Sequence, residues 1–366
     1  MTNPLLTMEG LPPFSQIRPE HVKPAIEQAI ADCKQRIVDV LQQSDSYTWD
    51  SLVAPLEEVD DKLSRIWSPV SHMNSVVNSD ELRAAHDGCL PLLSEYQTFV
   101  GQHAGLFAAF TQLAQSDEFA RLSEPQRKQI ENTLRDFRLS GIALPPEQQQ
   151  RYGQIVARLS ELASSFSNQV MDATLGWSKL VSDESELSGL PESARAAARQ
   201  LAQSRELEGW LFTLDIPSYL PVMMYADNRA LREEFYTAYT TRASELGPNG
   251  GKWDNSPLME EIVALRHELA ELLGFDSYAS YSLDTKMAES PAQVLGFLQD
   301  LASRSRPQAA RELDELKAFA QEEFGATDLA AWDLPYYGEK LKQHRYAISD
   351  ELLRPYFLAP RVISGL

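Results

Sequence analysis

The spacing of apolar residues is the feature that most narrows the fold of this chain. Between residues 152 and 173, apolar side chains recur at steps of three and four, which places them on one helix face that packs against a core. Pro145 and Pro146 precede the run, where a proline suits the first turn of a helix, and Gly176 follows it as a stop. The apolar positions are Tyr152, Ile155, Val156, Leu159, Leu162, Phe166 and Val170.

Helical spacing or composition extends over most of the remaining sequence. Two short segments differ, because residues 177–181 and 210–214 are rich in aromatic and β-branched side chains, which favour strands. The sequence therefore predicts a mainly α protein of long antiparallel helices with a small β element at 177–181 and 210–214. Further helices are predicted at residues 19–43, 49–67, 79–115, 123–139, 191–204, 228–245, 257–273 and 291–323.

The length of the chain bounds its domain organisation. With 366 residues, of which 43% are hydrophobic, it can bury more than one core and is too long for a single compact bundle. We expect an amino-terminal helical region at 1–140 and a second helical region at 141–366. Low hydrophobicity is what keeps segments disordered, so disorder is not expected over most of the length.

Charge and cysteine content exclude several classes of partner. A net charge of −20 repels the phosphates of nucleic acids and anionic membrane surfaces. No apolar run approaches the roughly 20 residues that span a bilayer, and the first residues lack the basic and apolar regions of a secretory signal. Cys33 and Cys89 could form one disulfide, but so sparse a pair is more typical of buried thiols in a reducing compartment. A cytoplasmic protein is expected.

Motifs that carry chemistry are largely missing. No two histidines lie three to five residues apart, so none has short-range zinc-ligand spacing. The sequence also lacks a Gly-x-Ser-x-Gly elbow, a phosphate-binding loop and a Cys-x-x-Cys pair. The six histidines are His21, His72, His86, His103, His267 and His344.

One segment imitates the first half of a zinc motif. His267 and Glu268 match the start of His-Glu-x-x-His, in which two histidines hold zinc and the glutamate polarises a bound water. Here Glu271 replaces the second histidine. His267 and Glu271 would share a helix face and could form a self-contained metal site, but a second nitrogen ligand is lost. A solvated helix face is the favoured interpretation.

Other polar and aromatic groups have two interpretations each. Acidic residues at 57, 58, 60 and 61 could bind a cation or form a solvated face, which is the commoner role of such runs. Tyrosines at 278, 281, 336 and 337 could grip a substrate or line packing seams. His72 and His103 could be ligands brought together by folding, although isolated histidines are more often structural. The acidic residues are Glu57, Glu58, Asp60 and Asp61.

Eight stretches of the sequence are similar to one protein family. They are spread along the chain in the family's order, and the match of which they are part covers essentially the whole chain. They resemble the thimet oligopeptidase-like zinc metallopeptidases. The segment ALRHELAELLGF at 264–275 is especially telling, as is DELLRPYF at 350–357. The other stretches are 1–7, 58–79, 90–103, 134–145, 214–223 and 252–255.

This resemblance implies a fold and an activity. Family members have two mainly helical lobes flanking a deep channel, and they hydrolyse internal bonds of short peptides. A His-Glu-x-x-His helix and a downstream glutamate hold the zinc, and that helix belongs to the carboxyl-terminal half. His267 lies in an upstream helix that resembles a non-catalytic segment, so it does not inherit the role of zinc ligand.

We therefore expect the amino-terminal half of such a metallopeptidase, truncated before the zinc site. No catalytic, cofactor-binding or metal-binding residue is assigned, and no zinc is expected in this chain although the complete enzyme would hold it. The chain alone is expected to be inactive, and exposed apolar helix faces would favour association. The alternative is a non-catalytic helical module that binds peptides or another protein.

Overall fold

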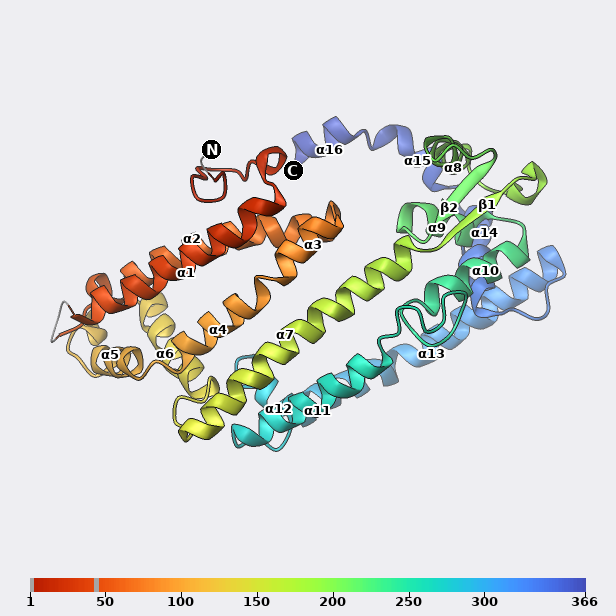
Figure 1. Cartoon of the computed structure of the whole chain (residues 1–366). Helices are drawn as coiled ribbons and strands as arrows, with labels where there is room; N and C mark the ends of the chain where they lie inside the picture. The colour runs from red at the N-terminus through yellow and green to blue at the C-terminus, as the bar shows by residue number, and fades with distance from the viewer. Residues whose placement is uncertain (1–2, 43–45) are drawn as a thin grey trace. The chain divides into compact units, whose positions relative to one another are not determined.

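The computed structural model describes residues 3–42 and 46–366, and nearly all regular structure in them is helical. The mainly α prediction is confirmed. Figure 1 follows the helices along the chain, with the small β element formed by strands β1 and β2. In the part of the chain that the structure describes, no helix combines the length and apolar character needed to cross a membrane.

The chain divides into two compact units, each built from two separate stretches. Unit 1 consists of Met1–Ser165 and Glu260–Asp284, and unit 2 consists of Phe166–Met259 and Thr285–Leu366. Helices α7, Pro146–Leu175, and α11, Ser256–Leu272, contribute residues to both units. These compact units are groups of contacting residues, whereas the predicted regions 1–140 and 141–366 are folding domains. The two predicted domains stay a prediction.

Unit 1 is a set of packed helices. Helix α1 packs along α2, as Figure 1 shows, and the core between them includes Val22, Ile26, Ile66 and Val70. The remaining core side chains come mainly from the helices that follow in sequence. The helices are α1 Pro19–Gln42, α2 Ala54–Val76, α3 Asp80–Asp87, α4 Leu90–Gly101, α5 Ala104–Ala114, α6 Glu124–Leu139 and α12 Tyr278–Leu283.

The single helix predicted over residues 79–115 is wrong, because three helices occupy this stretch. Helix α3 ends at Asp87 with Gly88 as its cap, and Pro91 stands in the first turn of α4, where its missing N–H costs no hydrogen bond. His103 then begins α5, since its Nδ1 accepts a hydrogen bond from the backbone N–H of Leu106 at 3.2 Å. A histidine cap lacks the serine, threonine, aspartate or asparagine that usually marks a helix start, so apolar spacing alone did not reveal it.

The β element is an antiparallel pair within unit 2. Strand β1, Ser178–Val181, pairs with β2, Trp210–Thr213, and Ser178 faces Thr213 in the register. The two predicted strands are confirmed to within one residue. Further helices of unit 2 are α8 Glu192–Ser204, α9 Ile216–Tyr225, α10 Arg229–Thr240, α13 Pro291–Phe324, α14 Leu334–Tyr346, α15 Asp350–Leu353 and α16 Ala359–Gly365.

Unit 2 has an aromatic core beside this sheet. Phe235 of α10 is fully buried, and its ring meets Trp177 edge-on at 4.9 Å and Phe212 at 6.1 Å between centroids. Helix α10 therefore packs against the sheet through a large ring, and Val222 and Met223 of α9 belong to the same core. Edge-to-face pairs of this kind stabilise a core beyond the area they bury.

Candidate functional site

His267 and Glu271 lie on the exposed face of α11. The side chains are 63% and 65% exposed, and His267 Nε2 lies 3.4 Å from Glu271 Oε1. Glu268, at the position of the catalytic glutamate in the zinc motif, forms two 2.6 Å hydrogen bonds with Arg151. These bonds from Arg151 lower the pKa of Glu268 and occupy both of its oxygens. The glutamate is therefore engaged in an ion pair.

The metal-binding side chains that the structure describes do not fit a catalytic zinc ion. A catalytic zinc needs three protein ligands at about 2 Å and an open fourth position. Within residues 3–42 and 46–366, no three histidine, cysteine, aspartate or glutamate side chains converge closely enough to hold a metal. The His267/Glu271 pair offers two donors on a solvated face and no third.

The other histidines considered from the sequence have separate local partners. His103 caps α5 through Leu106 and contacts the ring of Phe99. His72 contacts the ring of Phe14, with 6.0 Å between the ring centroids. Each histidine therefore has a structural contact of its own.

The four tyrosines lie in packing seams. Tyr278 and Tyr281 pack against the buried cluster around Tyr152, where α7 and α11 meet within unit 1. Tyr336 and Tyr337 lie on α14, where their rings meet edge-on at 5.0 Å. Of the four, Tyr336 also takes part in an extended polar network.

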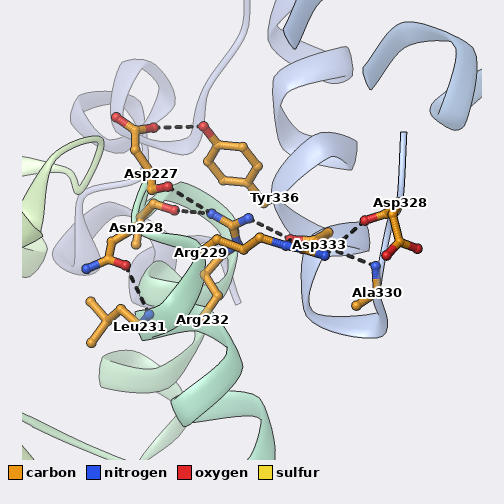
Figure 2. A network of polar contacts seen from close by, with 10 residues as sticks. Asp227, Asn228, Arg229, Leu231, Arg232, Asp328, Ala330, Asp333 and Tyr336 are labelled. Carbon is orange, nitrogen blue, oxygen red and sulfur yellow. Dashed lines mark hydrogen bonds and ion pairs between the residues drawn. The ribbon is translucent and has the colours of Figure 1, made fainter. Parts of the chain in front are cut away.

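This network joins the start of α10 to the start of α14 in unit 2, as Figure 2 shows. Asp333 is 1% exposed and accepts hydrogen bonds from two arginines. Nη2 of Arg229 and Nη2 of Arg232 each lie 2.7 Å from one of its oxygens. The backbone N–H of Ala330 completes the set at 2.9 Å. A buried carboxylate is thus surrounded by donors.

A second carboxylate extends the network on the opposite side of Arg232. The guanidinium of Arg232 lies 4.1 Å from the ring centroid of Tyr336 and donates to the carbonyl oxygen of Ala226 at 2.7 Å. The Tyr336 hydroxyl donates to Asp227 at 2.8 Å, a contact visible in Figure 2. Lys340 adds a cation 3.5 Å from the same carboxylate.

The electrostatics of this network make it a clamp that holds helices together. Burial alone would raise the pKa of Asp333, but hydrogen bonds from Arg229, Ala330 and Arg232 lower it below the usual range. The pKa of Asp227 is lowered in the same way, against burial, by Ser188, Tyr336 and Lys340. Both carboxylates stay ionised near neutral pH, so neither is suited to accept a proton in catalysis.

Acid should therefore weaken unit 2. Carboxyls whose pKa is lower in the folded than in the unfolded protein add stability above the unfolded pKa, here 3.8, and lose it as pH falls through the folded value. We expect Asp227 and Asp333 to add to the free energy of unfolding by an amount that is constant above about pH 5 and declines below about pH 4. Urea unfolding between pH 2.5 and 7 measures it. If the Asp333→Asn variant lost stability below pH 4 as steeply as the wild type, Asp333 would not be a source of this pH dependence.

A pocket of about 570 Å³ opens within unit 1 between α2, α4, α6 and α7. Asp60 and Asp136 place carboxylates on its wall, and Trp67, Leu93 and Phe137 supply apolar surface. All four residues of the acidic run are exposed, as the solvated-face interpretation predicts, and one of them also borders the pocket. Asp60 lines the pocket and accepts a 2.8 Å hydrogen bond from Tyr96, whereas Glu57 bonds Gln129 on the surface.

Sequence reasoning missed Arg229, Arg232, Asp227 and Asp333. One signal was available, because Arg232 follows Leu231 and precedes Phe235 and Ala238 on the apolar stripe of its helix. An arginine on such a stripe is fully buried only when it is paired. Its partner Asp333 lies 101 residues further along the chain, and no local pattern indicates it.

Comparisons with known proteins match this chain over its full length. Residues 222–366 match the family model described as Peptidase family M3. Residues 26–149 match the model described as Neurolysin/Thimet oligopeptidase, N-terminal domain. The resemblance stated from the sequence is confirmed.

Individual relatives agree with these matches. The chain is 63% identical to Oligopeptidase A of Haemophilus influenzae and 62% identical to Oligopeptidase A of Escherichia coli, in each case over all 366 residues. It is 37% identical to the Probable cytosolic oligopeptidase A of Arabidopsis thaliana. The whole chain aligns with each, and it spans 54%, 54% and 52% of their respective lengths. The chain belongs to peptidase family M3 and corresponds to about half the length of its oligopeptidase A relatives.

Proposed function

We propose that this chain is part of an oligopeptidase A-like zinc metallopeptidase that hydrolyses internal bonds of short peptides. The supporting observation is the 63% identity with an Oligopeptidase A, continuous over the whole chain. Identity at this level, with no interruption, makes a shared fold and a shared role the simplest account. The deep channel between two lobes remains part of this proposal.

The catalytic zinc would be bound by residues outside this sequence. In such enzymes zinc polarises the scissile carbonyl and activates a water molecule. The 366 residues contain no His-Glu-x-x-His motif, and the donors that the structure describes do not fit the ion. No residue of this chain is assigned a catalytic or metal-binding role. The chain alone is proposed to be inactive and to contribute helical scaffold.

A peptidase assay tests this proposal. The purified chain, given a quenched fluorogenic peptide of five to ten residues and added zinc, should show no turnover above buffer. Adding the remaining carboxyl-terminal part of the Escherichia coli Oligopeptidase A should produce zinc-dependent cleavage, because that part would supply the metal ligands. The matched control is the same part alone. Zinc-dependent turnover by the chain alone that disappears with His267→Ala would contradict the proposal.

A non-catalytic binding module is the second candidate. The pocket in unit 1 favours it, as do the exposed apolar side chains of α13, which include Leu295, Phe297, Leu298 and Leu301. Soluble monomers seldom expose large contiguous apolar patches, and such patches mark association sites. Calorimetric peptide binding by a folded, monomeric, metal-free chain would favour this candidate. Self-association without peptide binding would count against it.

We further propose that the protein acts in the cytoplasm on peptides and has no nucleic-acid or membrane partner. The acidic net charge of −20 supports the absence of polyanionic partners. Cys33 and Cys89 are free, buried thiols, which are typical of a reducing compartment. One relative at 37% identity is a probable cytosolic enzyme, while another at 37% is organellar.

A further inference from the structure

We propose that the pocket between α2, α4, α6 and α7 binds a small organic cation, a protonated amine carried on an apolar group. The pocket holds about 570 Å³, within the range of about 300–1,000 Å³ that is typical of small-molecule sites. All of its lining residues belong to unit 1. The inference concerns a site that the proposed peptidase function does not use.

The charge of the pocket wall selects a cation. Asp60 and Asp136 are the acidic residues among its described lining residues, which include no lysine, arginine or histidine. Asp136 is already paired, because Arg135 Nη2 lies 2.8 Å from its Oδ1. Asp60 is therefore the carboxylate left to neutralise a ligand.

Asp60 has a hydrogen-bond donor but no counter-ion. The Tyr96 hydroxyl donates to its Oδ1 at 2.8 Å, and no ion pair to Asp60 occurs in residues 3–42 and 46–366. Asp60 is exposed at the mouth of the pocket, and nearby protein raises the pKa of its carboxyl by partial desolvation, despite the hydrogen bonds from Tyr96 and Cys33. A carboxylate in this setting is stabilised by an added positive charge, which a protonated amine supplies.

The remaining wall suits an apolar body attached to that amine. Trp67 presents a ring held in place by stacking on His86, with 4.7 Å between centroids and 18° between planes. Leu63, Leu93 and Phe137 add aliphatic and aromatic surface. An aromatic face beside a carboxylate attracts a cation through both the ring quadrupole and the charge. Ser94, on the same wall, is 4% exposed and its hydroxyl has no hydrogen-bond partner among the described residues.

Other ligand classes fit less well. A phosphate or carboxylate would find no cationic side chain among the described lining residues and would be repelled by Asp60 and Asp136. A metal ion would need several converging donors, and the described part of the chain has no group of three. The shared chemistry of the remaining ligands is an amine on an apolar group, whether a free amine or the amino terminus of a peptide.

Calorimetric titration of the purified chain with 2-phenylethylamine tests the inference. We expect one site per chain, with 2-phenylethanol, the neutral analogue, binding at least about tenfold more weakly. Asp60→Asn should weaken amine binding by a similar factor, because it removes the counter-ion. Asp61→Asn, the same change at the adjacent exposed carboxylate outside the pocket, should leave affinity unchanged.

A second variant separates loss of charge from loss of folding. Ser160→Phe fills the pocket from α7 and leaves every carboxylate in place, so it should abolish binding while the circular dichroism spectrum is retained. The tripeptide Phe-Ala-Ala and its N-acetyl form distinguish a peptide ligand from a free amine. If the unacetylated tripeptide binds and the acetylated one does not, the ligand is a peptide amino terminus. If 2-phenylethylamine binds and neither tripeptide does, the ligand is a free amine. Absence of amine binding, or equal affinity in wild type and Asp60→Asn, would overturn the inference. Peptidase activity is not measured, so failure here leaves the proposed function intact.

Discussion

Replacing Asp333 by asparagine should lower the free energy of unfolding by about 3–5 kcal/mol, because it removes the counter-charge of a buried arginine. Asp333 and Arg232 are 1% and 2% exposed, so neither solvent nor salt can compensate for the loss. The amide would also place an NH₂ group among donors that now point at an oxygen. Urea-induced unfolding followed by circular dichroism measures the change.

Two variants test whether the effect comes from the unpaired charge. Asp328→Asn is the matched control, since Arg229 contacts only the backbone carbonyl of Asp328, and we expect a change below about 0.5 kcal/mol. The double variant Arg232→Met, Asp333→Asn removes both members of this buried ion pair, so its stability should recover part of the loss. A double variant that is less stable than Asp333→Asn alone would show that the cost does not come from the isolated arginine.

Truncating Phe235 to alanine should cost about 3–5 kcal/mol, the usual range for a large ring removed from a core. Phe235 is fully buried and touches both Trp177 and Phe212, which come from different segments around the small sheet. The surrounding backbone is held by strands β1 and β2 and by α9, so the cavity cannot readily collapse. The lost stability has three sources: the buried surface of the ring, its two edge-to-face contacts, and the cavity that the truncation leaves.

Phe297→Ala gives the matched control for this truncation. Phe297 lies on α13 and is 67% exposed, so the same chemical change should alter the free energy of unfolding by less than about 0.5 kcal/mol. Urea unfolding followed by tryptophan fluorescence is suited to the comparison, because Trp177 lies against Phe235. Similar losses in the two variants would show that α13 has a covered face in solution.

Helix α13 has exposed apolar side chains that could contact another part of a longer enzyme. Four of them, Leu295, Phe297, Leu298 and Leu301, are each more than half exposed on one helix. The chain spans about half the length of its oligopeptidase A relatives. The complementation assay proposed above would show whether the remaining part of such an enzyme associates with this one.

Helix content was predictable because it depends on local spacing. The stripe at 152–173 lies inside α7, and the helix predicted at 291–323 is α13 within one residue. The break within 79–115 was not predicted, since it arises from Pro91 and from a histidine cap whose role depends on side-chain orientation. The β element was predicted from its aromatic and β-branched content.

The polar sites were less accessible to sequence reasoning. Asp60 was considered only as one of four acidic residues on a helix face, and the sequence does not show that α4, α6 and α7 surround it. His267 was correctly read as part of a solvated face, since periodicity places Leu269 in the core and His267 outside it. The spacing of apolar residues thus predicts whether a side chain is buried. It does not predict which distant residues that side chain contacts.

The amino-acid sequence by itself determined the helical class, the paired strands and the family, because periodicity, β-branched content and extended similarity are all carried by neighbouring residues. Only the tertiary structure decided that Asp333 lies between Arg229 and Arg232, and that Asp60 lines a pocket in which no described cationic side chain pairs with it. These arrangements join residues about 100 positions apart in the network and four separate helices around the pocket. Their energies depend on burial and distance, which exist only once the helices have packed.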